Sequence, residues 1–86
     1  SWNRILVLVS TAQDKDADAM LGMLAALRGA KLFLTRNPFR GAELSFYGRW
    51  LDRAEGAWDS YEEAFLKVMS QAREGDLVLV TGSLYP

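Results

Sequence analysis

ILVLV (residues 5–9) is an uninterrupted apolar run of five residues, and DLVLVT (residues 76–81) repeats its character near the other end. A third run, KLFLT (residues 31–35), lies between them. Short, near-continuous runs of this kind are typical of parallel strands in α/β sheets, and we expect the runs at residues 5–9 and 76–81 to be covered on both faces. We therefore predict neighbouring parallel strands at residues 4–9, 31–35 and 76–81.

Helical spacing of apolar residues fills the intervals between these runs. A helix is predicted over residues 16–28, with Gly29 placed to end it. A second is predicted over residues 43–54, although Gly48 weakens it by about 1 kcal/mol relative to alanine. A third follows the capping-box sequence SYEE (residues 60–63) and is closed by Gly75.

The resulting order is β-α-β-α-(short β)-α-β, in which residues 56–58 supply the brief extra strand. Alternation of strands and helices implies right-handed crossovers and a mostly parallel sheet. The predicted fold class is therefore α/β, with helices packed on a mostly parallel sheet.

Composition excludes several classes of function. The 86 residues contain no cysteine and no histidine, so disulfide frameworks, common zinc sites and histidine-based triads are absent from this sequence. The net charge of −1 and the lack of a basic run argue against nucleic acid as a partner. No apolar run approaches the roughly 20 residues that span a bilayer, and no signal-peptide pattern is present. We expect a cytoplasmic protein without a membrane partner.

Three loops are expected to converge at the carboxyl ends of the predicted strands, where open α/β sheets bind ligands. They cover residues 10–16, 35–41 and 81–85. These loops carry the cations Lys15, Arg36 and Arg40 and the hydroxyls of Thr35, Thr81 and Ser83. That combination suits an anionic small molecule such as a dicarboxylate. No phosphate-binding loop or dinucleotide-binding glycine motif is present.

Three motifs on these loops are similar to those of a known family. DKD (residues 14–16), RGAE (residues 40–43) and DLVLVTGSLY (residues 76–85) resemble the carboxyl-terminal domain of the dihydrofolate synthase/folylpolyglutamate synthase family, in the Mur ligase superfamily. The resemblance covers most of the chain in the same order and spacing, and VTGSLY is its most specific element. Phe39 departs from the pattern, since the family usually has proline before the RGA triplet.

The resemblance implies a three-domain enzyme in which ATP and magnesium are bound mainly by other domains. The carboxyl-terminal Rossmann-like domain of that enzyme closes over the nucleotide site. The chemistry implied is activation of a folate or pteroate carboxylate as an acyl phosphate, followed by attack of the amine of L-glutamate. By the same resemblance, Lys15 and Ser83 lie near the glutamate carboxylates, with Arg40 as a weaker third contact.

The family's domain begins with a strand and helix that contain an Asp-Gly-Ala-His-Asn-Pro motif, and this sequence has no histidine. We therefore interpret residues 1–86 as one incomplete Mur ligase carboxyl-terminal-like domain, inactive by itself and prone to self-association. The alternative is a stand-alone, non-catalytic α/β module that binds a small anion.

Blander interpretations of individual residues stay open. Lys15 also fits a solvated loop lysine, Ser83 a turn residue and Arg40 a surface arginine. Asp14 and Asp16 are interpreted as helix caps rather than metal ligands. The three tryptophans are interpreted as packing residues, because no basic residues interleave them.

Overall fold

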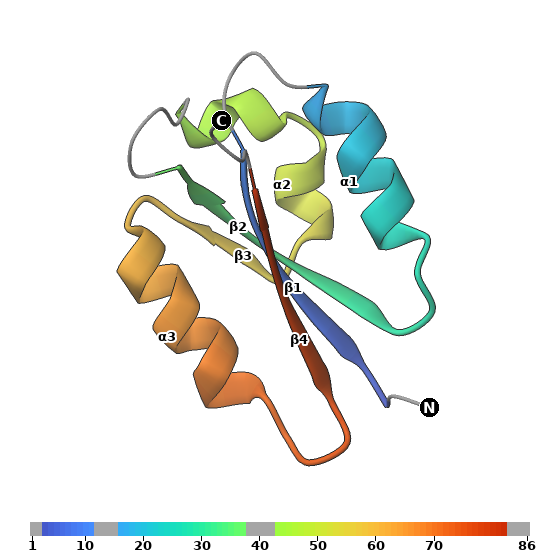
Figure 1. The fold of residues 1–86 in the computed structure, drawn as a ribbon. Helices are drawn as coiled ribbons and strands as arrows, with labels where there is room; N and C mark the ends of the chain where they lie inside the picture. Colours follow the sequence, from blue (N-terminus) through green and yellow to red (C-terminus); the bar gives the residue numbers. More distant parts are fainter. Residues whose placement is uncertain (1–2, 12–15, 38–42, 83–86) are drawn as a thin grey trace, which may run out of the picture.

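The computed structural model describes residues 3–11, 16–37 and 43–82 (Figure 1). The strands are β1 (Ile5–Thr11), β2 (Ala30–Arg36), β3 (Gly56–Trp58) and β4 (Leu77–Gly82). The helical segments are α1 (Ala17–Ala25), the 3₁₀ turn η1 (Leu44–Tyr47), α2 (Trp50–Arg53) and α3 (Tyr61–Gln71).

The sheet is parallel throughout and has the strand order β3-β2-β1-β4. The central strand β1 pairs with β2 on one side, with Ile5 opposite Ala30, and with β4 on the other, with Ile5 opposite Leu77. The predicted neighbouring parallel strands are therefore confirmed, as is the brief strand at residues 56–58. The chain has an α/β, Rossmann-like fold.

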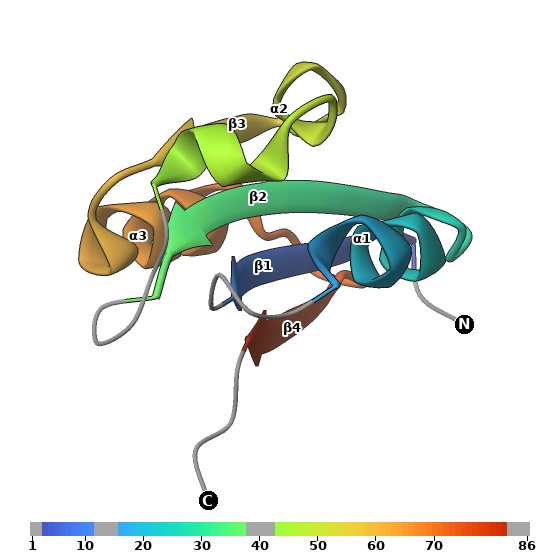
Figure 2. The same cartoon turned by 90° about the horizontal axis from the view of Figure 1, so that it is seen from above.

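The alternation of side chains along each strand divides the core into two layers. On one face, Val7 and Val9 of β1 pack with α1, η1 and α2. On the other face, Leu6 and Leu8 pack with Phe33 of β2 and with α3. Figure 2 shows α1 and α3 on opposite sides of the sheet. Both faces of β1 are therefore covered, as the sequence predicted.

The prediction that both faces of the last strand are covered is wrong. Whereas Leu6, Val7, Leu8 and Val9 are completely buried, β4 lies at the end of the sheet and the side chain of Val80 is 51% exposed. Both strands have the same apolar character, so the difference comes from strand order: β4 has one neighbouring strand and β1 has two.

The prediction of one continuous helix over residues 43–54 is also wrong. The segment forms η1 and the one-turn helix α2, separated at Gly48, which has φ +56° and ψ −127°. A residue in that conformation cannot continue an α-helix. The first helix is shorter than predicted, because α1 ends at Ala25 and Gly29, with φ +79°, lies in the turn that leads to β2.

Side-chain caps begin the two longer helices, as predicted. Asp16 Oδ1 accepts a hydrogen bond from the Ala19 backbone N–H at 3.1 Å. Ser60 Oγ accepts one from the Glu63 N–H, also at 3.1 Å. Asp14 lies outside the described residues. At its other end α3 stops at Gln71, and Gly75 lies in the following turn with φ +91°.

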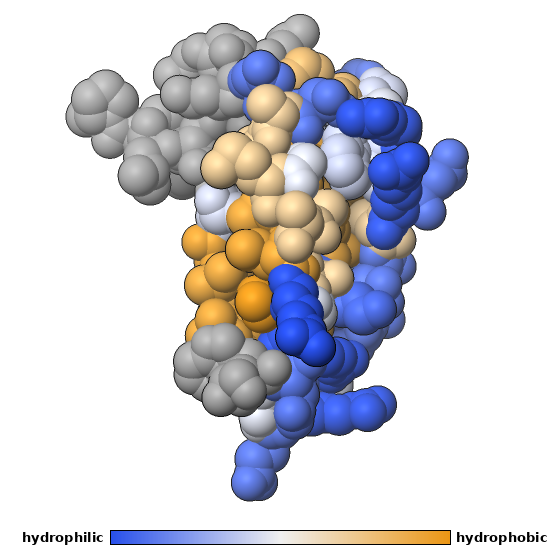
Figure 3. Space-filling model, turned by 90° about the vertical axis from the view of Figure 1, so that its right-hand side faces the viewer, coloured by the Kyte–Doolittle hydropathy of each residue, from blue (hydrophilic) through white to orange (hydrophobic). Residues whose placement is uncertain are grey.

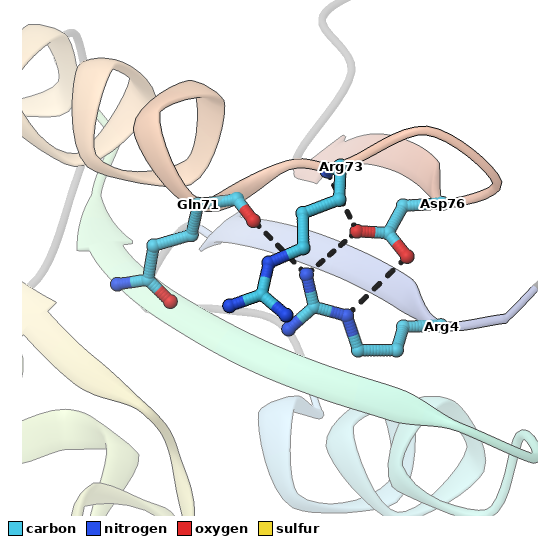
Figure 4. Close-up of polar contacts among 4 residues, drawn as sticks. All are labelled: Arg4, Gln71, Arg73 and Asp76. Atoms are coloured by element: carbon cyan, nitrogen blue, oxygen red, sulfur yellow. Dashed lines mark hydrogen bonds and ion pairs between the residues drawn. The ribbon is translucent and has the colours of Figure 1, made fainter.

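A partly buried ion pair ties the amino ends of β1 and β4 together (Figure 4). Arg4 donates from Nε to Asp76 Oδ1 at 3.3 Å and from Nη2 to Asp76 Oδ2 at 2.6 Å. Its Nη2 also donates to the Gln71 carbonyl, and the Arg73 backbone N–H donates to Asp76 Oδ2. The Asp76 side chain is only 2% exposed. These contacts, first of all the hydrogen bonds from Arg4, hold the pKa of Asp76 below its usual value.

None of the described helices has the length and apolarity needed to cross a membrane.

We predict that Asp76→Asn lowers the melting temperature at pH 7. The lowered pKa means that ionised Asp76 stabilises the folded chain above the ordinary aspartate pKa of about 3.9, and that this contribution is lost as the pH falls through the folded-state pKa. Melting curves from pH 7 to pH 2 should therefore converge for the two proteins in acid. Asp52→Asn, at an exposed position on α2, is the control. An unchanged melting temperature for Asp76→Asn at pH 7 would contradict the assigned role.

Candidate functional site

The carboxyl ends of three adjacent strands form the candidate site. β1 ends at Thr11, next to Arg36 at the end of β2, and Ser10 lies opposite Gly82 of β4. The segments that leave these strands are residues 12–15, 38–42 and 83–86. All three therefore start from neighbouring positions on one edge of the sheet, as the sequence predicted.

The connections between strands reverse direction at β1. From β1 the chain moves outward through β2 to β3, and then α3 carries it back across the other face to β4 on the far side of β1. Open α/β sheets bind ligands in a crevice at the carboxyl ends of the two strands that flank such a reversal. In this fold those strands are β1 and β4, so we expect the crevice between their carboxyl ends.

The predicted substrate-binding residues Lys15, Ser83 and Arg40 all lie outside the described residues, as does Phe39. Lys15 follows β1 by four residues, and Ser83 directly follows β4. The structure therefore places the strands that carry these two residues side by side. Arg40 follows β2 by four residues, and β2 lies on the side of β1 away from β4.

Thr35 was predicted to offer a hydroxyl to a ligand, and this is wrong. Its side chain is fully buried and its hydroxyl donates to the Trp58 carbonyl of β3 at 2.7 Å. The hydroxyl therefore stabilises the edge of the sheet. Trp58 also stacks on Phe33, with ring centroids 6.0 Å apart, which confirms its predicted packing role.

Arg36 is the last residue of β2 and lies at the predicted site, the carboxyl ends of the strands. Its guanidinium is 3.8 Å from the Asp59 carboxylate, and both side chains are substantially exposed. Because exposed pairs at this distance are weak, Arg36 can exchange Asp59 for another anion.

Tyr47 supports the strand ends from the face that carries α1. Its buried hydroxyl donates to the Thr35 carbonyl at 2.6 Å and lies 3.3 Å from the Val9 carbonyl. The phenol therefore bridges β2 and β1 just before their loops begin. This role of Tyr47 was not predicted, since the only signal in the sequence was an aromatic residue at helical spacing.

A second polar group fixes the start of α1 against α2. Asp18 accepts hydrogen bonds from the Trp50 indole N–H at 2.7 Å and from the Arg49 guanidinium at 3.1 and 3.2 Å. The hydrogen bond from Trp50 and, to a smaller extent, those from Arg49 lower the pKa of Asp18. Trp50 itself is almost fully buried, which confirms its predicted packing role, while Trp2 lies outside the described residues. The hydrogen bonds of Asp18 therefore help to orient α1, the helix that follows β1 in the chain.

A pocket of about 400 Å³ lies elsewhere, between α1, α2 and the beginning of β2. Its lining includes Trp50, Lys31, Arg53 and Glu55. Ala30 and Lys31 are the first residues of β2, so the pocket opens toward the amino end of that strand and away from the predicted site.

Among the described residues, no group of three or more acidic side chains is placed to hold a metal ion, so these residues do not form a magnesium site.

Comparisons with protein-family models, curated proteins and solved structures found no match for this chain.

We predict that Tyr47→Phe destabilises the fold by about 1 kcal/mol, the usual contribution of a neutral hydrogen bond, because two carbonyls lose their hydroxyl partner. Chemical denaturation measures the change. Tyr61→Phe removes a hydroxyl from α3, on the opposite face of the sheet, and serves as the matched control. If both variants behave alike, Tyr47 has no special role at the strand ends.

Proposed function

We propose that this chain is the amino-acid-positioning domain of an ATP-dependent amide-bond ligase that joins L-glutamate to a folate or pteroate acceptor. The site is the crevice between the carboxyl ends of β1 and β4. Lys15 and Ser83 bind the carboxylates of glutamate, and Arg40 contributes from the neighbouring segment. ATP and magnesium belong to other parts of the enzyme.

The observation that carries the proposal is the adjacency of β1 and β4 at the reversal of strand order. The DKD motif (residues 14–16) follows β1 and the SLY sequence (residues 83–85) follows β4, and the register pairs Ser10 with Gly82 near the carboxyl ends of the two strands. Two motifs separated by more than 60 residues therefore leave the sheet from adjacent strands, about 5 Å apart. A lysine on one and a serine on the other suit a carboxylate.

Arg36 adds a favourable charge at the same edge. Its weak ion pair with Asp59 leaves it able to attract a substrate with two carboxylates toward the strand ends. The Asp18 group and the Asp16 cap also give α1 a defined starting point, which fixes where the segment before it must end.

A stand-alone module that binds small anions is the alternative, and the same crevice supports it. The two candidates differ in selectivity. An amino-acid site discriminates L-glutamate from malonate, which lacks the amine and has a shorter separation between its carboxylates, whereas a general anion site responds to both. Titration of each ligand into the isotopically labelled chain, followed by amide NMR shifts at Thr11, Asp16 and Gly82, separates them.

In the full-length ligase that carries this domain, we predict that Lys15→Ala raises KM for glutamate roughly 10- to 150-fold, the loss expected for a charge-assisted hydrogen bond of about 1.5 to 3 kcal/mol. KM for ATP should stay unchanged. Ser83→Ala should have a smaller effect, roughly fivefold, because a neutral hydroxyl contributes about 1 kcal/mol. Steady-state kinetics in each substrate measures both constants.

Lys31→Ala is the matched control, because Lys31 is an exposed lysine at the amino end of β2, away from the crevice. It should leave both constants unchanged. A Lys15→Ala enzyme with normal dependence on glutamate but a lower melting temperature would assign Lys15 to a structural loop and remove the proposal.

A further inference from the structure

The two edges of the sheet differ in how they are protected from pairing with another strand. β3 is only three residues long, with Glu55 and Asp59 immediately before and after it. Short length and flanking charge are common protections of an edge strand. β4 has six residues, LVLVTG, without a charge or a proline, and it pairs one-to-one with β1 from Leu77 to Gly82 without a bulge. Among the described residues, the one charge that directly flanks β4 is Asp76, which is paired with Arg4, so the β4 edge is less protected than the β3 edge.

Backbone groups of β4 alternate between β1 and the free edge. The Leu77 N–H donates to the Arg4 carbonyl of β1. In a parallel ladder the N–H and C=O of one residue point to the same side, and those of the next residue point to the opposite side. The backbone groups of Leu77 point to β1, so those of Val78 and Val80 point to the free edge. These two residues can donate to and accept from a further strand without disturbing the pairing of β4 with β1.

The flank of α3 that points away from β3 carries two exposed apolar side chains. Ala64 and Val68 point into the core, and Leu66 lines a pocket with Trp58 of β3. At 100° per residue, Phe65 and Met69 lie on the opposite flank of the helix, away from β3. Both side chains are exposed. They lie on the same face of the sheet as Val78 and Val80.

The flank of α1 on the other face has the same character. Asp18 and Gly22 face Trp50 of α2, which lies toward β3. Met20 and Met23 lie on the opposite flank, and Met23 is 74% exposed. Figure 3 shows apolar side chains gathered over a continuous area on this side of the molecule. We call the surface formed by β4 and these two flanks the β4 surface.

We propose that the β4 surface binds a second copy of this chain through antiparallel pairing of the two β4 strands. A two-fold axis perpendicular to the sheet, centred on Leu79, places Val78 opposite Val80 of the second copy. Both residues present backbone groups to the edge, so this register makes about four hydrogen bonds across the axis. Opposite residues point to the same face, so leucines meet leucines or threonine, and valines meet valines.

A second copy also fits the flanks and the charge of the surface. The two-fold axis brings the α1 flanks of both copies to one face and the α3 flanks to the other, so each apolar stripe meets a copy of itself. The net charge of −1 gives little repulsion between copies. A protein partner of complementary charge is not favoured, because β4 itself carries no charge for it to match.

The area is enough for a weak dimer. A six-residue strand is about 20 Å long and a sheet with a helix on each face is about 30 Å thick, so each copy contributes on the order of 600 Å². The total, on the order of 1,200 Å², is at the lower limit for specific interfaces. We expect a monomer–dimer equilibrium with a dissociation constant between about 10 µM and 1 mM.

Sedimentation velocity across that range tests the proposal with Val80→Pro and its matched control Val80→Ala. Proline removes an N–H that points to the free edge and leaves the ladder with β1 intact, whereas alanine keeps that N–H. Val80→Pro should be monomeric at concentrations where Val80→Ala and the original chain dimerise. A chain that is monomeric at 1 mM, or a dimer unaffected by Val80→Pro, overturns the proposal.

Amide hydrogen exchange of the unaltered chain keeps the test decisive if Val80→Pro fails to fold. Val78 and Val80 amides should exchange rapidly in dilute solution and at least tenfold more slowly at high concentration. Leu77 and Leu79 amides, bonded to β1, should be protected at both. Dimers in which Val78 and Val80 remain unprotected would use another surface and would likewise overturn the proposal.

Discussion

The complete burial of β1 is the constraint on which the rest of the structure depends. Four consecutive side chains of this strand have no exposed surface, and they alternate between two separate cores. A strand buried on both faces must also satisfy its backbone on both edges, because water cannot reach it. β2 and β4 supply those partners. The order of the sheet, the division of the helices between its faces and the position of the crevice all follow from β1 being central.

Local sequence pattern predicted the elements that depend on local physics. The four strands, the Asp16 cap and the Ser60 cap were all predictable, because apolar runs and capping residues act over a few positions. The break at Gly48 was not, since the apolar spacing of residues 43–54 continues through it and only the backbone conformation interrupts the helix. Periodicity describes which face is buried and does not show whether the backbone is continuous.

Features that depend on strand order escaped prediction for a different reason. The runs at residues 5–9 and 77–80 look alike, yet one is central and the other is an edge strand. Nothing within either run determines how many neighbours it has. The same holds for Thr35 and Tyr47, whose hydroxyls bond to backbone carbonyls on other strands. At the candidate site the sequence predicted which loops converge, while the positions of Lys15, Ser83 and Arg40 stay predictions.

The two proposals share β4 but use different parts of it. The crevice lies beyond its carboxyl end, whereas pairing with a second copy uses its lateral edge. Antiparallel pairing places Asp76 of the second copy beside Gly82, next to the proposed binding site for an anion. An uncompensated carboxylate there would repel glutamate. Asp76 is instead held by Arg4 and by the Arg73 backbone N–H, and its side chain is 2% exposed. The ion pair that joins the amino ends of β1 and β4 in one copy therefore also neutralises the charge that it brings to the crevice of the other.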